Sequence, residues 1–156
     1  VCSSDLYAMQ TLDLARPMVA SLAVGIAQRA INEAVKYAKE RVTFGKPIIK
    51  HEVISFKLAD MDMKTEVARS AIINFLNTYY AEPKRSYTRE AAIAKCFAGD
   101  ISVEVALEAV QILGGFGYSR EYPVEKLVRD AKIMQIYEGT NEVQRMVIAG
   151  FVAAQK

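Results

Sequence analysis

The chain has little of what several classes of protein depend on. Its 156 residues include two cysteines, Cys2 and Cys96, and a single histidine, His51. Two cysteines cannot build a disulfide framework, which suits a protein of a reducing compartment. One histidine without a cysteine cluster gives no support for metal ligation. We expect Cys96 to be packed in the interior rather than reactive.

The chain also lacks a long apolar run and a strong charge of either sign. No apolar stretch reaches the roughly 18 residues that cross a bilayer, and residues 1–9 do not form a secretory signal. The formal net charge is +2, and the basic residues are interspersed with acids. Nucleic acid and membrane surfaces are therefore not expected partners. With 52% apolar and 24% charged residues, the chain should form one globular domain with a sizeable core.

Three long segments carry apolar residues at the three- and four-residue intervals of an amphipathic helix. The first is expected to run from Pro17, a natural first helical residue, and to stop near the segment 43–47, where glycine and proline occur. The second begins near Val53, and the third covers residues 88–113 and ends at the glycine pair 114–115. The core stripe of the second helix is Ile54, Leu58, Met61, Thr65, Ala68, Ile72, Phe75 and Tyr79.

Two shorter helices are expected after the long ones. Residues 123–131 form one, and Asn141 with Gln144 three residues later resembles a capping box that opens the last. No strand, internal repeat or low-complexity segment is expected. Three long helices and a shorter fourth, joined by short loops, predict an all-α, up-and-down antiparallel four-helix bundle. The last helix is expected to bury Val143, Met146, Val147, Gly150 and Phe151.

The most informative segment for chemistry precedes this last helix. An apolar run ends at the carboxylate Glu138, and Gly139 follows, with the helix-capping residues Thr140 and Asn141 behind it. Glycine tolerates backbone angles that other residues avoid and lets a ligand approach closely. A carboxylate between an apolar wall and a glycine can be aimed at a bound substrate. The alternative is a structural carboxylate near a helix N-terminus, where negative charge is mildly favoured.

Four motifs, in the same order, resemble those of the acyl-CoA dehydrogenases. They read K-E-R-V-T-F-G-K-P at 39–47, A-V-Q-I-L-G-G-F-G-Y at 109–118, E-Y-P-V-E-K-L-V-R-D-A-K at 121–132 and I-Y-E-G-T-N-E-V-Q-R at 136–145. Four spaced motifs are far more specific than a single short pattern. The resemblance extends from Met9 onward and is closest to the short- and medium-chain members. It implies the same helical bundle, as the C-terminal domain of the family.

The resemblance implies FAD-dependent α,β-dehydrogenation of acyl-CoA thioesters, as in fatty-acid β-oxidation. Glu138 aligns with the base that removes the Cα proton while a hydride passes from Cβ to the flavin. The backbone N–H of Glu138 would help to hold the thioester oxygen, and Tyr137 and Gly139 would contact the substrate. The nearby helix N-terminus would lower the pKa of Glu138, whereas burial against flavin and substrate would raise it. The sequence does not decide between these effects, although exclusion of water by substrate favours burial.

Some members of the family place the base on the first long helix, just before an Arg-Pro pair. Here that position is Ala15, followed by Arg16 and Pro17. Alanine cannot remove a proton, so Glu138 is left as the base. Asp13 and Arg16 match positions that lie near the acyl-CoA or brace the site. Their alternative interpretation is as surface charges at a helix start.

The resemblance also implies contacts with FAD. Arg41 is suited to the diphosphate, because a guanidinium binds phosphate bidentately. Glu52 departs from the neutral amide that relatives often carry beside His51, which puts Glu52 in doubt as a contact. The pair Gly114–Gly115 is either a helix stop, a close backbone approach to the cofactor, or both. The resemblance implies contacts with the FAD diphosphate and adenosine, largely across the subunit boundary, from Arg41, Thr43 and Phe44. It also implies contacts with the neighbour's ADP moiety from Gln111, Gly114 and Gly115, and places His51 near the FAD and Thr140 and Glu142 near the flavin of the same subunit.

Residues 1–6 match no pattern of the family and are expected to be a non-native leader. Residues 7–156 are expected to be the C-terminal helical domain, without the N-terminal helical and middle β domains of the family. The fragment alone should therefore be inactive. The family implies a homotetramer built as a dimer of dimers, electron-transferring flavoprotein as acceptor, and a bacterial cytoplasm or mitochondrial matrix. Alternatives are an acyl-CoA oxidase, a branched-chain member, or a non-catalytic helical oligomerisation module.

Overall fold

The computed structural model describes residues 3–83 and 85–155, with side chains from residue 11 onward in these ranges. The structure is almost entirely helical, so the all-α prediction is confirmed. The third long helix has the predicted bounds. The second long helix and the short helix predicted at 123–131 each begin within one residue of the predicted position. The elements are α1 (Ser3–Glu40), β1 (Val42–Thr43), β2 (Lys46–Pro47), the 3-10 helix η1 (Ile48–Lys50), α2 (Glu52–Ala81), α3 (Thr88–Leu113), α4 (Gly115–Tyr118), α5 (Val124–Ile133) and α6 (Asn141–Ala153).

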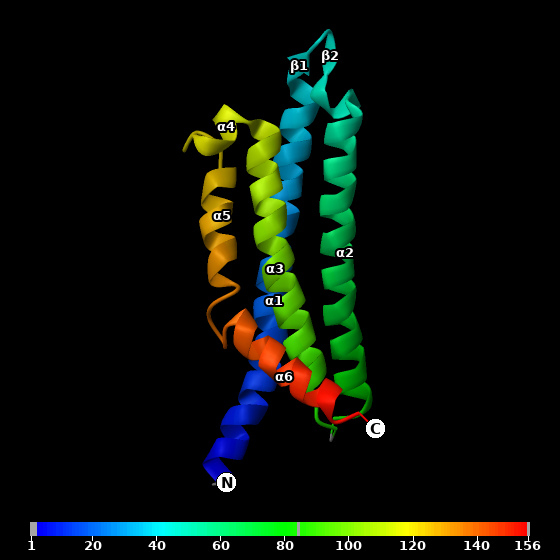
Figure 1. Ribbon diagram of the computed structural model, residues 1–156, viewed down its shortest axis with the longest axis vertical. Helices are drawn as coiled ribbons and strands as arrows, with labels where there is room; N and C mark the ends of the chain where they lie inside the picture. Colours follow the sequence, from blue (N-terminus) through cyan, green and yellow to red (C-terminus); the bar gives the residue numbers. More distant parts are fainter. Residues whose placement is uncertain (1–2, 84, 156) are drawn as a thin grey trace.

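Four helices lie side by side and alternate in direction (Figure 1). The long helices α1, α2 and α3 pack against one another, and the shorter α5 packs along α3 and α1. Helix α6 instead crosses α3 obliquely near the end where α3 begins. The shorter fourth helix of the antiparallel arrangement is therefore α5. None of the helices in the described ranges is long and apolar enough to cross a membrane.

The core is centred on the contact between α1 and α3, which are both rich in alanine. Small side chains allow two helix backbones to approach closely, so these stripes bring α1 and α3 together. The predicted stripe of α2 covers this pair, with Leu58, Met61, Thr65, Ala68, Ile72 and Phe75 buried and Ile54 and Tyr79 half-buried. Fully buried alanines include Ala20, Ala23, Ala27, Ala30 and Ala34 of α1 and Ala91, Ala98, Ala106 and Ala109 of α3.

The predicted start of the first helix is wrong. Helix α1 begins at Ser3 and continues through Pro17, which removes one backbone hydrogen bond from the helix interior. Arg16 and Pro17 are both buried at this point, so tertiary packing offsets the local cost of the proline. Of the expected leader, residues 1 and 2 lie outside the described residues, and residues 3–6 belong to α1.

A small β-hairpin between α1 and α2 contradicts the expectation of no strand. Strands β1 and β2 pair antiparallel, with Val42 opposite Pro47 and Thr43 opposite Lys46. Between them, Phe44 has φ +51° and Gly45 has φ +77°. Positive φ at both central residues is typical of a type I′ turn, which suits a two-residue hairpin loop. Strands of two residues are too short to show the alternation that identifies a strand in sequence.

Candidate functional site

The turn between α5 and α6 carries Glu138 and has an unusual backbone. Glu138 has φ +56° and Gly139 has φ +86°. Positive φ is common for glycine but uncommon for a glutamate, and such strain is concentrated at functional sites. The Glu138 residue is half-buried. The turn therefore holds the predicted carboxylate in a conformation that the surrounding structure must maintain.

The cap of α6 differs from the predicted capping box. Thr140, not Asn141, is the N-cap residue, and its Oγ1 accepts a hydrogen bond from the Val143 N–H at 3.3 Å. Asn141 is the first helical residue, and the Gln144 side chain turns back toward the turn instead of capping the helix. The capping prediction is wrong because the helix begins one residue earlier than predicted, with Thr140 as N-cap, and the Gln144 amide donates to the carbonyls of Glu138 and Gly139 instead.

The predicted buried face of α6 is also wrong. The buried residues of this helix are Asn141 and Gln144, both polar. Met146 is 73% exposed, and Val143 and Phe151 are also exposed. Since α6 crosses α3 obliquely, its N-terminal end meets α3 while most of its apolar side chains lie outside the core.

The Gln144 side chain holds the turn by hydrogen bonds to its carbonyl oxygens. Its Nε2 donates hydrogen bonds to the carbonyl oxygens of Glu138 at 3.2 Å and Gly139 at 3.1 Å. A Cβ atom at residue 139 would lie 2.6 Å from this Nε2, a distance that real Cβ atoms do not show. Glycine is therefore required at position 139 for two reasons, the positive φ and the close approach of the Gln144 amide.

Lys95 of α3 is a second support of the turn, and it was not among the residues predicted from sequence. The residue is 0% exposed, and its Nζ donates to the Gly139 carbonyl at 2.8 Å and to Asn141 Oδ1 at 2.9 Å. Asn141 Nδ2 in turn donates to Asp100 Oδ1 at 2.8 Å and to the Cys96 carbonyl at 3.0 Å. Burial lowers the pKa of Lys95, because the charged form is poorly solvated there.

A sequence signal for Lys95 was present. The residue lies four positions after Ala91 and three before Ala98, on the stripe that the helical period assigns to the core. A lysine on a buried stripe is rare unless it is paired, so it indicates a polar contact inside the protein. Its partner could not be identified from sequence, because the Gly139 turn lies 44 residues away along the chain.

Tyr137 packs against the main core beside the turn. It is half-buried, and its hydroxyl donates to the Met134 Sδ at 3.2 Å. Burial raises the pKa of Tyr137, and the negative charge of Glu138 adds to the shift. The Tyr137 ring is therefore an apolar surface beside the turn, and its hydroxyl is influenced by the negative charge of Glu138.

Asp13 and Arg16 are not simple surface charges. Arg16 is 4% exposed, and its Nη1 donates to Asp13 Oδ1 at 3.0 Å. The Thr88 hydroxyl, at the start of α3, donates to Asp13 Oδ2 at 2.5 Å. Together they join α1 to α3. Arg16 is thereby tied, through Asp13, to the beginning of α3.

Thr140 and Glu142 lie beside a polar hollow of about 560 Å³ next to the turn. Hydrogen bonding from the backbone N–H of Glu142 and from the Thr140 side chain lowers the pKa of the Glu142 carboxyl. Glu142 is thus ionised at the N-terminus of α6, where negative charge is favoured. The hollow is lined by Asp100, Lys132, Gln135, Ile136, Thr140, Asn141, Glu142 and Arg145.

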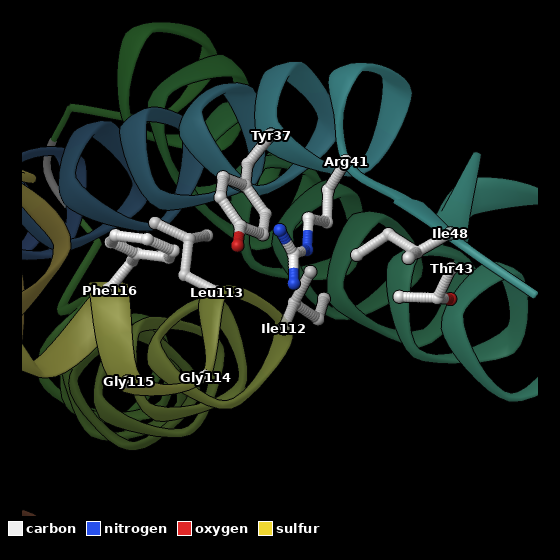
Figure 2. Close-up of a pocket in the computed structure, with 9 residues that line it drawn as sticks. All are labelled: Tyr37, Arg41, Thr43, Ile48, Ile112, Leu113, Gly114, Gly115 and Phe116. Atoms are coloured by element: carbon white, nitrogen blue, oxygen red, sulfur yellow. The ribbon is translucent and has the colours of Figure 1, made fainter.

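A second hollow, of about 360 Å³, lies at the opposite end of α1. Figure 2 shows Arg41 reaching from the end of α1 toward Ile112, between Tyr37 and Ile48. The structure therefore brings together several residues that were expected to contact FAD from two distant motifs. This second hollow is lined by Tyr37, Arg41, Thr43, Ile48, Ile112, Leu113, Gly114, Gly115 and Phe116.

The remaining predicted contacts at this end lie around that hollow. His51 Nε2 is 3.2 Å from Thr43 Oγ1, so the histidine braces the hairpin. The Phe44 ring is 96% exposed and lies edge-on to His51, with centroids 6.2 Å apart. Gln111 is exposed and does not line the hollow, although its carbonyl accepts the Gly114 N–H at 3.2 Å.

The predicted site residues thus form two groups at opposite ends of the bundle (Figure 1). Arg16 is linked through Asp13 to the beginning of α3, the end that α6 crosses, and Arg41 follows the last residue of α1. At about 1.5 Å per residue, the helix between them is roughly 36 Å long. Within the residues that the structure describes, no group of His, Cys, Asp and Glu side chains could hold a metal ion.

Comparison with known proteins identifies the class. The model of the family "Acyl-CoA dehydrogenase, C-terminal domain" matches residues 6–153, so the chain belongs to the acyl-CoA dehydrogenase family. This confirms the resemblance seen in the four motifs.

Among individual proteins, the chain is 54% identical over 143 residues to the short-chain specific acyl-CoA dehydrogenase of Megasphaera elsdenii, covering 92% of this chain and 37% of that protein. It is 47% identical over 145 residues to the caffeyl-CoA reductase-Etf complex subunit CarC of Acetobacterium woodii, covering 93% and 38%. The solved structure of Megasphaera elsdenii butyryl-CoA dehydrogenase superposes with a TM-score of 0.89 and 53% identity, over 94% and 38%. The chain therefore spans less than two fifths of the relatives that it matches.

Proposed function

We propose that this chain is the C-terminal helical part of an FAD-dependent acyl-CoA dehydrogenase in which Glu138 is the catalytic base. The observation that carries the proposal is the Glu138–Gly139 turn, which has two successive positive φ angles. Its carbonyl oxygens accept hydrogen bonds from Lys95 and Gln144. Strain that the surrounding structure maintains is a feature of catalytic positions. The 54% identity to a short-chain enzyme supports a short acyl-CoA as the substrate class.

In the proposed reaction, the Glu138 carboxylate removes the proton from Cα of the thioester. FAD, when bound, accepts the hydride that leaves Cβ. The backbone N–H of Glu138 makes no hydrogen bond to any residue in the described ranges, so it is available to the thioester oxygen. A donor aimed at the developing enolate oxygen stabilises the transition state. Tyr137, half-buried against the core beside the turn, would supply an apolar wall next to the carboxylate once substrate has displaced water.

The residues at the other end of the bundle fit the ADP portion of FAD. Arg41 offers a guanidinium for a diphosphate, and Gly114 and Gly115 leave open space where a Cβ would otherwise stand. The roughly 36 Å of helix between the two groups supports an arrangement in which they serve different FAD molecules. We therefore propose a homotetramer, a dimer of dimers, with each FAD between two subunits. Exposed apolar side chains on α2 (Val53, Phe56, Met63, Val67 and Ile73) support extensive contacts with other subunits or domains.

The short coverage of the relatives supports a longer protein with N-terminal helical and middle β domains, which would complete the site. We propose electron-transferring flavoprotein as the acceptor, because one relative is named as part of an Etf complex. The bacterial relatives support a bacterial cytoplasm. An acyl-CoA oxidase would differ by consuming oxygen instead of reducing the flavoprotein.

The test is the Glu138→Gln substitution in the full-length flavin-loaded enzyme. We expect flavin content to be unchanged and the turnover number with a short acyl-CoA to fall at least ~100-fold, as is typical for loss of a general base. Glu104→Gln is the matched control, since Glu104 is an exposed carboxylate paired with Lys64 on the α2–α3 surface. Normal turnover by the Glu138 variant would show that the base is elsewhere. Loss of turnover in both variants would point to a general defect.

A further inference from the structure

Lys95 is the buried cation that the proposed reaction leaves unused. It is completely buried in α3, among alanines, and no carboxylate forms an ion pair with it in the described residues. Burial of an ammonium group is unfavourable unless hydrogen bonds compensate, and an apolar side chain of similar size is often better for stability alone. Its presence at this position therefore points to a requirement other than packing.

The two hydrogen bonds of Lys95 identify that requirement. One goes to the carbonyl oxygen of Gly139, the residue directly after the proposed base, at 2.8 Å. The same oxygen accepts from Gln144 Nε2 at 3.1 Å, and this Nε2 also reaches the Glu138 carbonyl at 3.2 Å. Both carbonyl groups of the strained turn are thus anchored from inside the protein. A charged donor makes hydrogen bonds roughly twice as strong as a neutral one.

The position of the ammonium is itself fixed. Its second hydrogen bond goes to Asn141 Oδ1, and Asn141 Nδ2 donates to Asp100 Oδ1 at 2.8 Å. Asp100 also accepts from Gln135 Nε2 at 2.7 Å and pairs with Arg145 at the surface. Asn141 therefore links the buried cation of α3 to a carboxylate on the next turn of the same helix. Gly99 lies between them, where a Cβ would be 3.0 Å from the Met134 carbonyl, so the loop approaches α3 closely.

We propose that Lys95 is a positioning residue for Glu138: its ammonium holds the Gly139 carbonyl so that the left-handed turn aims the carboxylate and N–H of Glu138 at the substrate. The proposal rests on the proposed role of Glu138 as the base. A turn with positive φ at two successive residues relaxes readily when its anchors are lost. Misplacement of a catalytic group by about 1 Å costs roughly 10²-fold in rate.

The test compares Lys95→Met with Met61→Ala in the full-length flavin-loaded enzyme. Met61 is 1% exposed in α2 and packs beside Val105, away from the turn, so its variant measures general destabilisation. For Lys95→Met we expect a turnover number about 100-fold lower and a KM within about threefold of the parent. The kinetic isotope effect for deuterium at Cα should increase, because proton removal becomes slower. Met61→Ala should retain the parent's turnover number per flavin and its isotope effect.

Hydrogen exchange supplies a readout that does not depend on activity. The Asn141 N–H donates to the Gln135 carbonyl at 2.9 Å and closes the loop that contains Glu138. The peptide covering residues 135–145 should exchange faster in Lys95→Met than in the parent or in Met61→Ala. Unchanged exchange in that peptide would overturn the positioning role, whatever the activity.

A loosened loop with a turnover number within about twofold of the parent would also overturn the proposal. An equal loss of turnover in Met61→Ala would assign the effect to general destabilisation and overturn it as well. The Glu138→Gln variant, assayed alongside, separates this failure from that of the proposed function. If Glu138→Gln turns over normally, the base assignment fails, and with it the catalytic purpose of Lys95, even where exchange shows that Lys95 holds the turn.

Discussion

The replacement of Gly139 by alanine tests the central geometry of the site. Gly139 has φ +86°, and an added Cβ would lie 2.6 Å from Gln144 Nε2. Gly45 offers a matched control, since it has φ +77° but no atom within 4 Å of the added Cβ. Both variants carry the same backbone penalty, and only Gly139→Ala carries the contact. The difference between the two variants therefore isolates the role of Gln144.

The expected magnitudes follow from these two contributions. A left-handed conformation costs an alanine about 1–2 kcal/mol, and this applies to both variants. In Gly139→Ala, the Gln144 amide must also move away and give up its two hydrogen bonds to the carbonyls of Glu138 and Gly139. Each bond contributes about 1 kcal/mol net. We expect a loss of about 3–4 kcal/mol for Gly139→Ala and about 1–2 kcal/mol for Gly45→Ala.

Urea unfolding of the 156-residue chain, followed by circular dichroism, measures the difference. With a slope of about 2 kcal/mol per M, the midpoints of the two variants should differ by about 1 M urea. In a Gln144→Ala background the two glycine substitutions should cost about the same, because the contact is gone. Equal midpoints in the parent background would refute the reasoning.

Two further predictions concern charge and cofactor. The pKa of Glu142 is lowered from its usual 4.5 by hydrogen bonds from its own backbone N–H and from Thr140. The ionised carboxylate therefore stabilises the folded state fully at pH values above 4.5. This stabilisation is lost as the pH falls through the lowered pKa. Glu142→Gln should thus reduce stability to urea at neutral pH but not in acid below the folded-state pKa; an equal loss at both would contradict this. The 156-residue chain alone should bind FAD weakly or not at all and should have no turnover, because its two groups of predicted contacts lie at opposite ends of α1. Stoichiometric yellow flavin that co-purifies with the chain would contradict the second prediction.

Local periodicity was sufficient for the long helices α2 and α3. The bounds of α3 and the buried stripe of α2 follow from apolar spacing, because both helices present one continuous face to a single core. The four motifs were sufficient for the family, and Gly139 marked a turn that only glycine accommodates. These features depend on residues that are close in sequence, so the chain encodes them directly.

The support of the turn was decided by tertiary structure. Gln144 reaches the Gly139 carbonyl from only five residues away, but Lys95 reaches it because α6 crosses the beginning of α3, and no local pattern predicts that crossing. The same crossing exposes Met146, which periodicity assigned to the core. Pro17 lies inside α1, where it and Arg16 are buried, although a proline removes one hydrogen bond of the helix. Amino-acid order thus determined α2, α3 and the position of the carboxylate, whereas the buried Lys95 contact, between residues 44 positions apart, was decided by the tertiary structure.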